Sequence, residues 1–550
     1  MGKPIRKITI VGGGTAGWMS ALFLSTFVKT GKRSQGRIKV SLIESPNIPT
    51  VGVGEATVPG MPNILKMCGI SEKQFFKTCN ASFKLGVLFD RWNNDASGKP
   101  LAYVNPFSKG NPIGGIDPAW YYLREGAGRL DYVQTISPCV DLWLQKKGPR
   151  PIGAGDFDGQ VGFAYHLDAG KFAGLLKDVC IQRGVEHILD DMVKVEKDDR
   201  GHIAAVQLKQ TGRHPVELVI DCTGFRGLII NEALGVPFES YADYLGNDRA
   251  MAVQLPHPDP DKIEPMTRST ALGAGWSWRV PLYNRIGTGY VFSSAHRTDD
   301  QARDEFRAHL AEFHPDGATA EPRVIPMRVG RTARAWEKNC IAIGLTSGFI
   351  EPLESTAIYM IEMGLRWLLT YFPDSDFPQP VTDRYNKVSM DLYDEVRDFI
   401  CLHYALNNRT DDYWHDARRL KIPDSLAENI DLWKHSLPAP YDLGAYSLFS
   451  PATYQAVLLG KGVYHTGYGN PKMAPAIAMN KDRWKAYLKQ TRARIDTITR
   501  ELPDHKTLLT HLRGDPPQTA SAPQATVPLP GAPSSIKAPP LMPTETASLL

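Results

Sequence analysis

The chain has no apolar run that approaches the roughly 18–20 residues of a membrane-spanning helix. It also lacks an excess of either charge, since 63 basic residues face 59 acidic ones. No basic stripe with interleaved aromatic residues is present, and such a stripe is a usual mark of a nucleic-acid-binding surface. These absences argue against a membrane span and against nucleic acid as a partner.

Cysteine is scarce: its seven copies lie singly, at positions 68, 79, 139, 180, 222, 340 and 401, and none forms a C-x-x-C pair. Such scattering argues against a disulfide framework and a structural zinc site, and it indicates a reducing compartment. A signal peptide is also lacking, because residues 1–7 lead into a glycine-rich turn rather than an apolar segment with a cleavage site. We therefore predict a cytoplasmic protein without a metal site.

Composition divides the chain into three regions. With 42% apolar residues in 550, it can bury a sizeable core and form more than one module. We predict a cofactor-binding module over residues 1–380 with interleaved substrate-site segments, then a helical substrate-binding part over residues 381–514, clearest at 383–403. Nine of the 42 prolines fall in residues 515–550, where aromatic residues are absent, so this region is predicted to be a disordered tail.

A dinucleotide-binding pattern opens the chain. Residues 7–11 form a β-branched run, residues 12–17 read GGGTAG, and residues 18–28 have a helical pattern; a second strand candidate over residues 38–43 ends at an acid. The glycines let the backbone approach a pyrophosphate at the helix N-terminus, and the acid can accept hydrogen bonds from a ribose. The residues predicted to hold the cofactor are Gly12, Gly14, Thr15, Ala16, Gly17 and Glu44.

Further glycine turns favour FAD over NAD. Residues 51–59 read VGVGEATVP and contribute Gly54, Glu55 and Ala56, while residues 219–227 and 340–345 are β-like runs that end in small residues. Several strand-to-glycine turns that converge on one cofactor are typical of FAD monooxygenase-type folds. On the alternative interpretation, the later glycines are ordinary sheet turns. We predict an α/β, FAD-binding monooxygenase-like fold with a mainly helical C-terminal part.

Residues 347–357, SGFIEPLESTA, place the carboxylate of Glu354 in a mainly apolar run. Ser355 and Thr356 come directly before a helical pattern over residues 357–369. The start of a helix offers free backbone N–H groups and the positive end of the dipole. The segment therefore predicts an acid beside a potential anion site.

Trp276 and Trp278 alternate at strand spacing before Pro281. On residue pattern alone, this is a strand that puts two aromatic side chains on one face of a core.

Taken in order, the GGGTAG turn, the VGVGEATVP loop, the W-x-W-x-x-P run at residues 276–281 and the PLEST run at residues 352–356 resemble the flavin-dependent halogenases. The PLEST run is similar to the tryptophan/indole branch in particular. The resemblance covers most of residues 5–420. It implies that reduced FAD, supplied by a separate flavin reductase and reaching the enzyme by diffusion, reacts with O₂ and with chloride or bromide to give hypohalous acid.

The resemblance also implies roles for residues. Lys84 captures the hypohalous acid, Glu354 removes the ring proton, Thr356 and Ala357 hold the halide, and Trp276 and Trp278 line the passage. Val193, Leu345 and Ile358 join the cofactor contacts.

On pattern alone, Lys84 would be a solvated charge on the face of a helix. Burial beside Phe83 and Leu85 would lower its pKa from about 10.4. A neutral amine can be halogenated and an ammonium can polarise hypohalous acid, and the sequence leaves both open.

Four departures from the family's pattern bear on halide and substrate. Ala357 takes the place of the usual glycine, which bears on the halide site. The sequence NPFS at residues 105–108 takes the place of H-x-F-G, and Phe449 takes the place of a tryptophan. Phe107 and Phe449 could sandwich an indole ring. The stretch that grips the amino-acid end in the family is short here, at residues 437–454, which predicts a small indole-type substrate and argues against free tryptophan.

Two other functions fit the same residues. An FAD-dependent aromatic hydroxylase would share the fold and leave Lys84 without a role. A non-catalytic flavin-binding scaffold would use its proline-rich tail to recruit partners. A monomer and a homodimer are equally compatible with the sequence.

Overall fold

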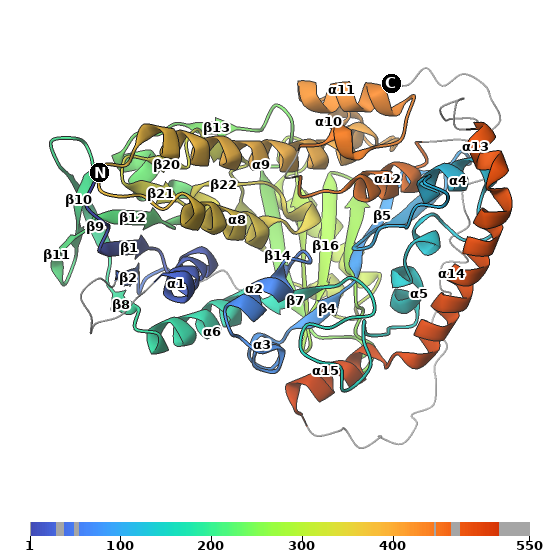
Figure 1. Cartoon of the computed structure of the whole chain (residues 1–550), viewed down its shortest axis with the longest axis horizontal. Coiled ribbons are helices and arrows are strands. Elements are labelled where there is room, and N and C mark those ends of the chain that lie inside the picture. The colour runs from blue at the N-terminus through green and yellow to red at the C-terminus, as the bar shows by residue number, and fades with distance from the viewer. Residues whose placement is uncertain (1, 29–37, 49–53, 445–446, 464–473, 516–550) are drawn as a thin grey trace.

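The computed structural model describes residues 2–28, 38–48, 54–444, 447–463 and 474–515. The predicted tail lies outside the described residues from position 516 on, as do positions 51–53 of the second glycine-rich loop. In Figure 1 a mainly parallel sheet lies at one end of the molecule, a larger sheet lies in the middle, and the long helix α14 runs along the other end.

The mainly parallel sheet has six strands, and the β-branched run at the start of the chain is one of its central strands. All neighbouring pairs are parallel except β20·β21. In sheet order the strands are β20 (Trp336–Glu337), β21 (Cys340–Ala342), β12 (Leu218–Asp221), β1 (Lys7–Val11), β2 (Lys39–Glu44) and β8 (Glu186–Leu189).

The larger sheet has seven strands, and all its pairs are antiparallel except β15·β5. In sheet order they are β18 (Arg323–Pro326), β14 (Arg249–Leu255), β17 (Ile286–Phe292), β16 (Gly275–Pro281), β15 (Thr267–Leu272), β5 (Gly86–Asn94) and β6 (Pro100–Pro106). The predicted W-x-W strand is therefore confirmed as β16.

Three small sheets complete the β-structure of the described residues. The first consists of β3 (Gly54–Ala56), β7 (Ala164–Asp168) and β4 (Ser82–Lys84), the second of β11 (Gly212–Pro215), β10 (Ile203–Leu208) and β9 (Met192–Lys197), and the third of β13 (Phe238–Ser240), β19 (Gly330–Thr332) and β22 (Gly348–Phe349). The first of these sheets brings the second glycine-rich loop, through β7, next to the segment that carries Lys84.

The helices that precede residue 378 are α1 (Thr15–Phe27), α2 (Met61–Met67), α3 (Glu72–Cys79), α4 (Pro118–Glu125), α5 (Cys139–Leu144), α6 (Ala169–Gln182), α7 (Asp299–Ala311) and α8 (Ala357–Thr370). The later ones are α9 (Gln379–Ala405), α10 (Asp412–Ala417), α11 (Asp424–Trp433), α12 (Pro451–Gly460), α13 (Ala474–Met479), α14 (Lys481–Glu501) and α15 (His505–Arg513). Within the described ranges, no helix combines the length and apolar character needed to span a membrane.

Helix boundaries differ from the sequence expectation at two points. Helix α1 begins at Thr15, three residues before the apolar pattern does, because the glycine-rich turn itself enters the helix. Helix α9 has a proline in its first turn, where the missing N–H costs nothing, and it runs through the predicted boundary at residue 380. One continuous set of buried apolar side chains includes residues of β1, α9, α12 and α14, so the C-terminal helices share the core of the cofactor-binding part.

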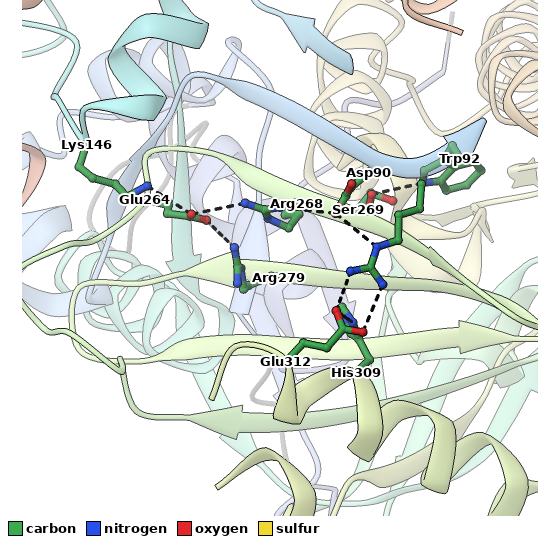
Figure 2. A network of polar contacts seen from close by, with 10 residues as sticks. Asp90, Trp92, Lys146, Glu264, Arg268, Ser269, Arg279, His309 and Glu312 are labelled. Carbon is green, nitrogen blue, oxygen red and sulfur yellow. Dashed lines mark hydrogen bonds and ion pairs between the residues drawn. The ribbon is translucent and has the colours of Figure 1, made fainter. Parts of the chain in front are cut away.

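Figure 2 shows charged side chains that link three strands of the seven-stranded sheet. Arg268 on β15 and Arg279 on β16 are register partners, and like charges placed opposite each other repel. The Glu264 carboxylate lies 3.6 Å from Arg268, 2.8 Å from Arg279 and 3.4 Å from Lys146. Burial opposes its ionisation, but these cations outweigh burial and hold the pKa of Glu264 well below its usual range. Arg268 also lies 3.6 Å from Asp90 on β5, so the network fixes the strands next to the candidate site.

Candidate functional site

The glycine-rich turn packs too closely for side chains at two of its positions. Gly12 has a φ of +119°, and a Cβ there would lie 2.2 Å from the Cys222 carbonyl oxygen. A Cβ at Gly17 would lie 1.8 Å from the Gly12 oxygen, so α1 packs directly on the end of β1. At Gly14, the N-cap of α1, a Cβ would meet nothing within 4 Å, and no side chain caps the helix. The turn therefore offers free amides to an open space, which fits a bound pyrophosphate.

Glu44 lies at the end of the second strand of the mainly parallel sheet, as the sequence predicts. It ends β2, and a Cβ at Gly13 would come 2.3 Å from its side chain. Its Oε2 lies 2.8 Å from His187 Nε2 on β8 and 3.9 Å from Lys177 Nζ. A carboxylate at this edge of a parallel sheet is suited to a ribose.

The later glycine turns converge on the same edge, as predicted. Strand β12 pairs with both β1 and β21 in parallel. A Cβ at Gly344 would lie 2.5 Å from that of Ala16, and Thr346 Oγ1 donates to the Gly224 carbonyl at 3.1 Å. Three turns that are far apart in sequence thus meet beside the start of α1.

The remaining predicted cofactor residues lie in different settings. Leu345 is 42% exposed, Val193 on β9 is 62% exposed and Ile358 on α8 is buried. Burial raises the pKa of Glu55 on β3 to about 7, against the opposing charge of Lys84. Their contacts with a cofactor stay predictions.

Lys84 is completely buried at the end of β4. Its Nζ donates to the Thr57 carbonyl oxygen at 3.0 Å and to Ser355 Oγ at 2.9 Å. The amine lies 5.4 Å from the centroid of the Phe107 ring. Burial lowers the pKa of Lys84 to about 7, although Glu354 and Glu55 oppose the shift. A lowered pKa is the effect expected when an amine is buried, and it leaves a large fraction of the Lys84 side chains uncharged near neutral pH.

Glu354 is buried between polar side chains of β6 and α9. Asn105 Nδ2 donates to Oε1 at 3.1 Å and to Oε2 at 3.0 Å. His403 Nε2 lies 3.1 Å from Oε1, and its Nδ1 lies 3.2 Å from the Tyr103 hydroxyl. Because the Tyr103 hydroxyl can donate to Nδ1, the neutral imidazole can present Nε2–H to the carboxylate.

The His403 ring is held rigidly. It stacks on Phe89 at 4.6 Å between centroids and meets Phe399 edge-on at 5.2 Å. Burial lowers the pKa of His403, and Lys461 adds to this, while Glu354 opposes it. The imidazole is therefore held neutral beside Glu354. Sequence reasoning missed both Tyr103 and His403, although His403 is the last residue of the predicted helical stretch 383–403.

A second buried carboxyl, that of Glu351, supports the tryptophan pair. Its Oε2 accepts hydrogen bonds from Trp276 Nε1 at 2.7 Å, Tyr404 OH at 2.6 Å and Asn247 Nδ2 at 3.0 Å. Burial raises the pKa of Glu351, against these donors. The network was not predicted, because its donors come from three distant segments.

The two tryptophan rings lie 6.3 Å apart on β16, and a Cβ at the register partner Gly289 would lie 2.0 Å from the Trp278 ring. The absence of a side chain at Gly289 therefore lets Trp278 lie flat across β17.

The predicted anion site follows Glu354 directly. Ser355 is left-handed, with a φ of 60°, and this turn separates the direction of Glu354 from that of the following amides. Thr356 is the N-cap of α8, its side chain does not cap the helix, and Ala357 is the first helical residue. The geometry leaves the first amides of α8 available to an anion.

The two predicted substrate rings lie in different surroundings. Phe107 lies against Lys84, as described above. Phe449 is buried and stacks on Phe399 at 3.9 Å between centroids, so one of its faces is occupied by protein. Phe399 also contacts His403, so Phe449 is linked to Glu354 through Phe399 and His403 and does not contact it directly through these rings. A sandwich of Phe107 and Phe449 around a substrate stays a prediction.

Comparisons with known proteins agree on one family. The family model described as tryptophan halogenase matches residues 7–474. A tryptophan 6-halogenase from Streptomyces toxytricini is 37% identical over 497 residues, which cover 86% of this chain and 91% of the relative.

Two solved structures are similar over nearly the whole chain. A tryptophan halogenase from Shewanella frigidimarina has a TM-score of 0.85 at 34% identity and covers 93% of this chain and 98% of its own. A flavin-dependent halogenase from Brevundimonas sp. has a TM-score of 0.81 at 37% identity and covers 93% of this chain and 99% of its own.

Proposed function

The chain belongs to the tryptophan halogenase family of flavin-dependent enzymes, and we propose that it halogenates an indole-type substrate with chloride or bromide, using FADH₂ and O₂. The observation that carries this proposal is Lys84, a buried amine with a lowered pKa that is hydrogen-bonded to the residue after Glu354. One amine and one carboxylate are thus held at opposite sides of a single turn.

FAD would lie along the open glycine-rich turn, with Glu44 at its ribose. When bound and reduced by a separate flavin reductase, it supplies with O₂ the oxidising power that turns a halide into hypohalous acid. The first amides of α8, at Thr356 and Ala357, would hold the halide, because they are uncapped and lie at the positive end of the helix dipole. Trp276 and Trp278 would line the passage between this region and Lys84.

The neutral amine of Lys84 captures the hypohalous acid. The lone pair of Nζ attacks the halogen, an N–X bond forms, and hydroxide leaves and takes a proton from the amine, so the products are an N-haloamine and water. The two acceptors, Thr57 O and Ser355 Oγ, can occupy both hydrogens of a neutral amine. This arrangement fixes the direction of the lone pair.

Glu354 completes the reaction as a general base. The substrate ring attacks the halogen and a C–X bond forms, while the N–X bond breaks. Nζ takes a proton from the water released in the capture step, which restores the neutral amine and leaves hydroxide, and the proton that Glu354 later gives up neutralises that hydroxide. The ring cation then loses its proton to Glu354, and aromaticity returns. Asn105 donates to both oxygens, and the His403 ring crowds Oε1, since its Nε2 lies 3.1 Å from that atom. Oε2 is therefore the oxygen better placed to accept the proton.

The substrate is an indole-type compound without an amino-acid group. Phe107 beside Lys84 offers an aromatic face for a flat ring. The segment expected to grip a carboxylate and an ammonium is short in this chain, so free tryptophan should be a poor substrate.

A product assay tests the proposed function. The purified protein, a flavin reductase, FAD and NADH are incubated in air with indole or tryptophan, with bromide or chloride, and products are identified by mass spectrometry. We expect halogenated indole that depends on halide. An oxygenated product formed equally well without halide would instead indicate an aromatic hydroxylase, and no turnover of any indole would favour a non-catalytic flavin-binding protein.

Activity should depend on pH through Lys84. The neutral amine becomes the major form as pH rises through about 7, so the halogenation rate should increase over the same interval. Flavin reoxidation, followed by absorbance at each pH, serves as the control, because it does not require this amine. A rate that falls as pH rises through 7, with unchanged flavin reoxidation, would show that the ammonium is the active form.

A further inference from the structure

The side-chain amide of Asn105 has hydrogen-bond partners for its nitrogen but none, among the described residues, for its oxygen. Its side-chain nitrogen donates to both oxygens of Glu354. Its side-chain oxygen, Oδ1, is buried and has no hydrogen-bond partner among the residues that the structure describes. The residue as a whole is only 5% exposed, so bulk water does not readily reach the free oxygen.

The orientation of this amide is fixed by chemistry. An ionised carboxylate only accepts hydrogen bonds, so the end of Asn105 that faces Glu354 must be the nitrogen. The oxygen consequently points away from Glu354. Buried polar atoms in folded proteins are nearly always paired, and an unpaired one indicates a missing partner. That partner must be a hydrogen-bond donor, because Oδ1 can only accept.

Asn105 lies on β6 between two residues that contact other groups of the candidate site. Along β6 and just past it, alternate residues meet successive parts of the site: Tyr103 contacts His403, Asn105 contacts Glu354, and Phe107 lies against Lys84. The strand itself is held close to β5, since a Cβ at Gly86 would lie 2.6 Å from the Asn105 carbonyl oxygen.

We propose that Asn105 is a specificity-determining residue whose Oδ1 accepts a hydrogen bond from the ring N–H of the substrate while its Nδ2 holds Glu354. The inference rests on the proposed function, in which Glu354 and Lys84 act on an indole-type ring. One side chain then sets the distance between the ring nitrogen of the substrate and the base. The aromatic C–H edges of the ring cannot replace the N–H, because they are weak donors.

This role predicts which substrates are rejected. A site built to pair with a substrate N–H discriminates against an analogue without it, since the buried acceptor is then left unpaired. Indene has the shape of indole without a ring N–H, and 1-methylindole has a methyl group in the place of that hydrogen. Both should bind and react poorly, whereas substituents elsewhere on an indole should matter less.

The experiment compares the ratio of kcat/KM for indole to kcat/KM for 1-methylindole between the wild type and variants, rather than the individual rates. In the wild type, kcat/KM for indole should exceed that for 1-methylindole by roughly ten-fold or more. Asn105→Leu keeps the size of the side chain and removes both hydrogen-bonding ends, so it should lower both values and bring their ratio close to one. Asn105→Asp keeps an acceptor oxygen and should retain the discrimination ratio, although both rates should fall because an aspartate no longer donates to Glu354 and its charge opposes that of the base. A general structural defect would lower both rates without changing the ratio.

A second measurement needs no variant. Titration calorimetry on the wild-type protein, without a flavin reductase or halide so that no turnover occurs, measures the binding affinity of each ring compound. Indole should bind about ten-fold more tightly than indene, if Oδ1 pairs with the ring N–H. Equal affinities, or an unchanged kcat/KM ratio in Asn105→Leu, would overturn the inference. If the wild type halogenates no indole at all, the proposed function fails instead, and the two failures are thereby distinguished.

Discussion

Lys84→Met should abolish halogenation, with a loss on the order of 10³-fold or more in kcat, while FAD binding and flavin reoxidation remain close to wild type. Methionine has nearly the length of lysine but no amine, so nothing in the site can form the N–X bond. The side chain is already buried, and an apolar replacement does not introduce an unpaired charge. Product formation is measured by chromatography, and flavin reoxidation is measured by absorbance in the same samples.

Lys461→Met provides the matched control. Lys461 is also completely buried, burial lowers its pKa to about 7, and its Nζ donates to Asn93 Oδ1 at 2.7 Å and to the His403 carbonyl oxygen at 2.9 Å. Its partners are Asn93 and the backbone of His403, so its loss removes no group from the turn that carries Glu354. Its loss should lower the melting temperature and leave halogenated product detectable. Normal halogenation by Lys84→Met would refute the role of Lys84, and equal loss in both variants would point to folding.

Glu354→Gln should lower kcat for halogenation by roughly 10²–10⁴-fold, the range typical of losing a general base. Glutamine keeps the size and some hydrogen bonds of the side chain, but its amide does not take the proton that the ring cation must lose. Proton removal then becomes slow. A substrate deuterated at the halogenated carbon should therefore react measurably more slowly than the ordinary substrate in the variant, and the difference should be larger than in the wild type.

Glu362→Gln is the control for this variant. Glu362 on α8 is likewise buried, but its carboxylate pairs with Arg366, 2.7 Å away and four residues further along the same helix. Its replacement should affect stability and leave the isotope effect unchanged. Wild-type rates in Glu354→Gln, at normal FAD loading, would show that another group or water accepts the proton.

The sequence by itself predicted the cofactor-binding part of the fold, because that part depends on local patterns. A β-branched run, a glycine-rich turn and an acid at the end of the next strand each have a local physical reason. The later turns at Gly224 and Gly344 were predicted to converge with it, and they do. That these turns contact a cofactor stays a prediction.

The chemical character of the site was decided only by tertiary structure. Lys84 has a surface-like local sequence, and its lowered pKa follows from burial against Phe107 and the segment around Ser355. Burial of a charge depends on residues hundreds of positions away, so no local pattern reports it. The surroundings of Glu354 are likewise set by tertiary structure, because its polar neighbours Asn105 and His403 lie on β6 and α9.

The sequence therefore determined which residue types could perform the reaction and in which segments they lie. It marked Glu354, the amides that follow it, and position 105 as a departure from the family's pattern. Tertiary structure decided what that departure means: the Asn105 nitrogen faces the base and its oxygen is left without a donor. A hydrogen bond has a direction and a length, and these exist only once distant strands and helices have been brought together.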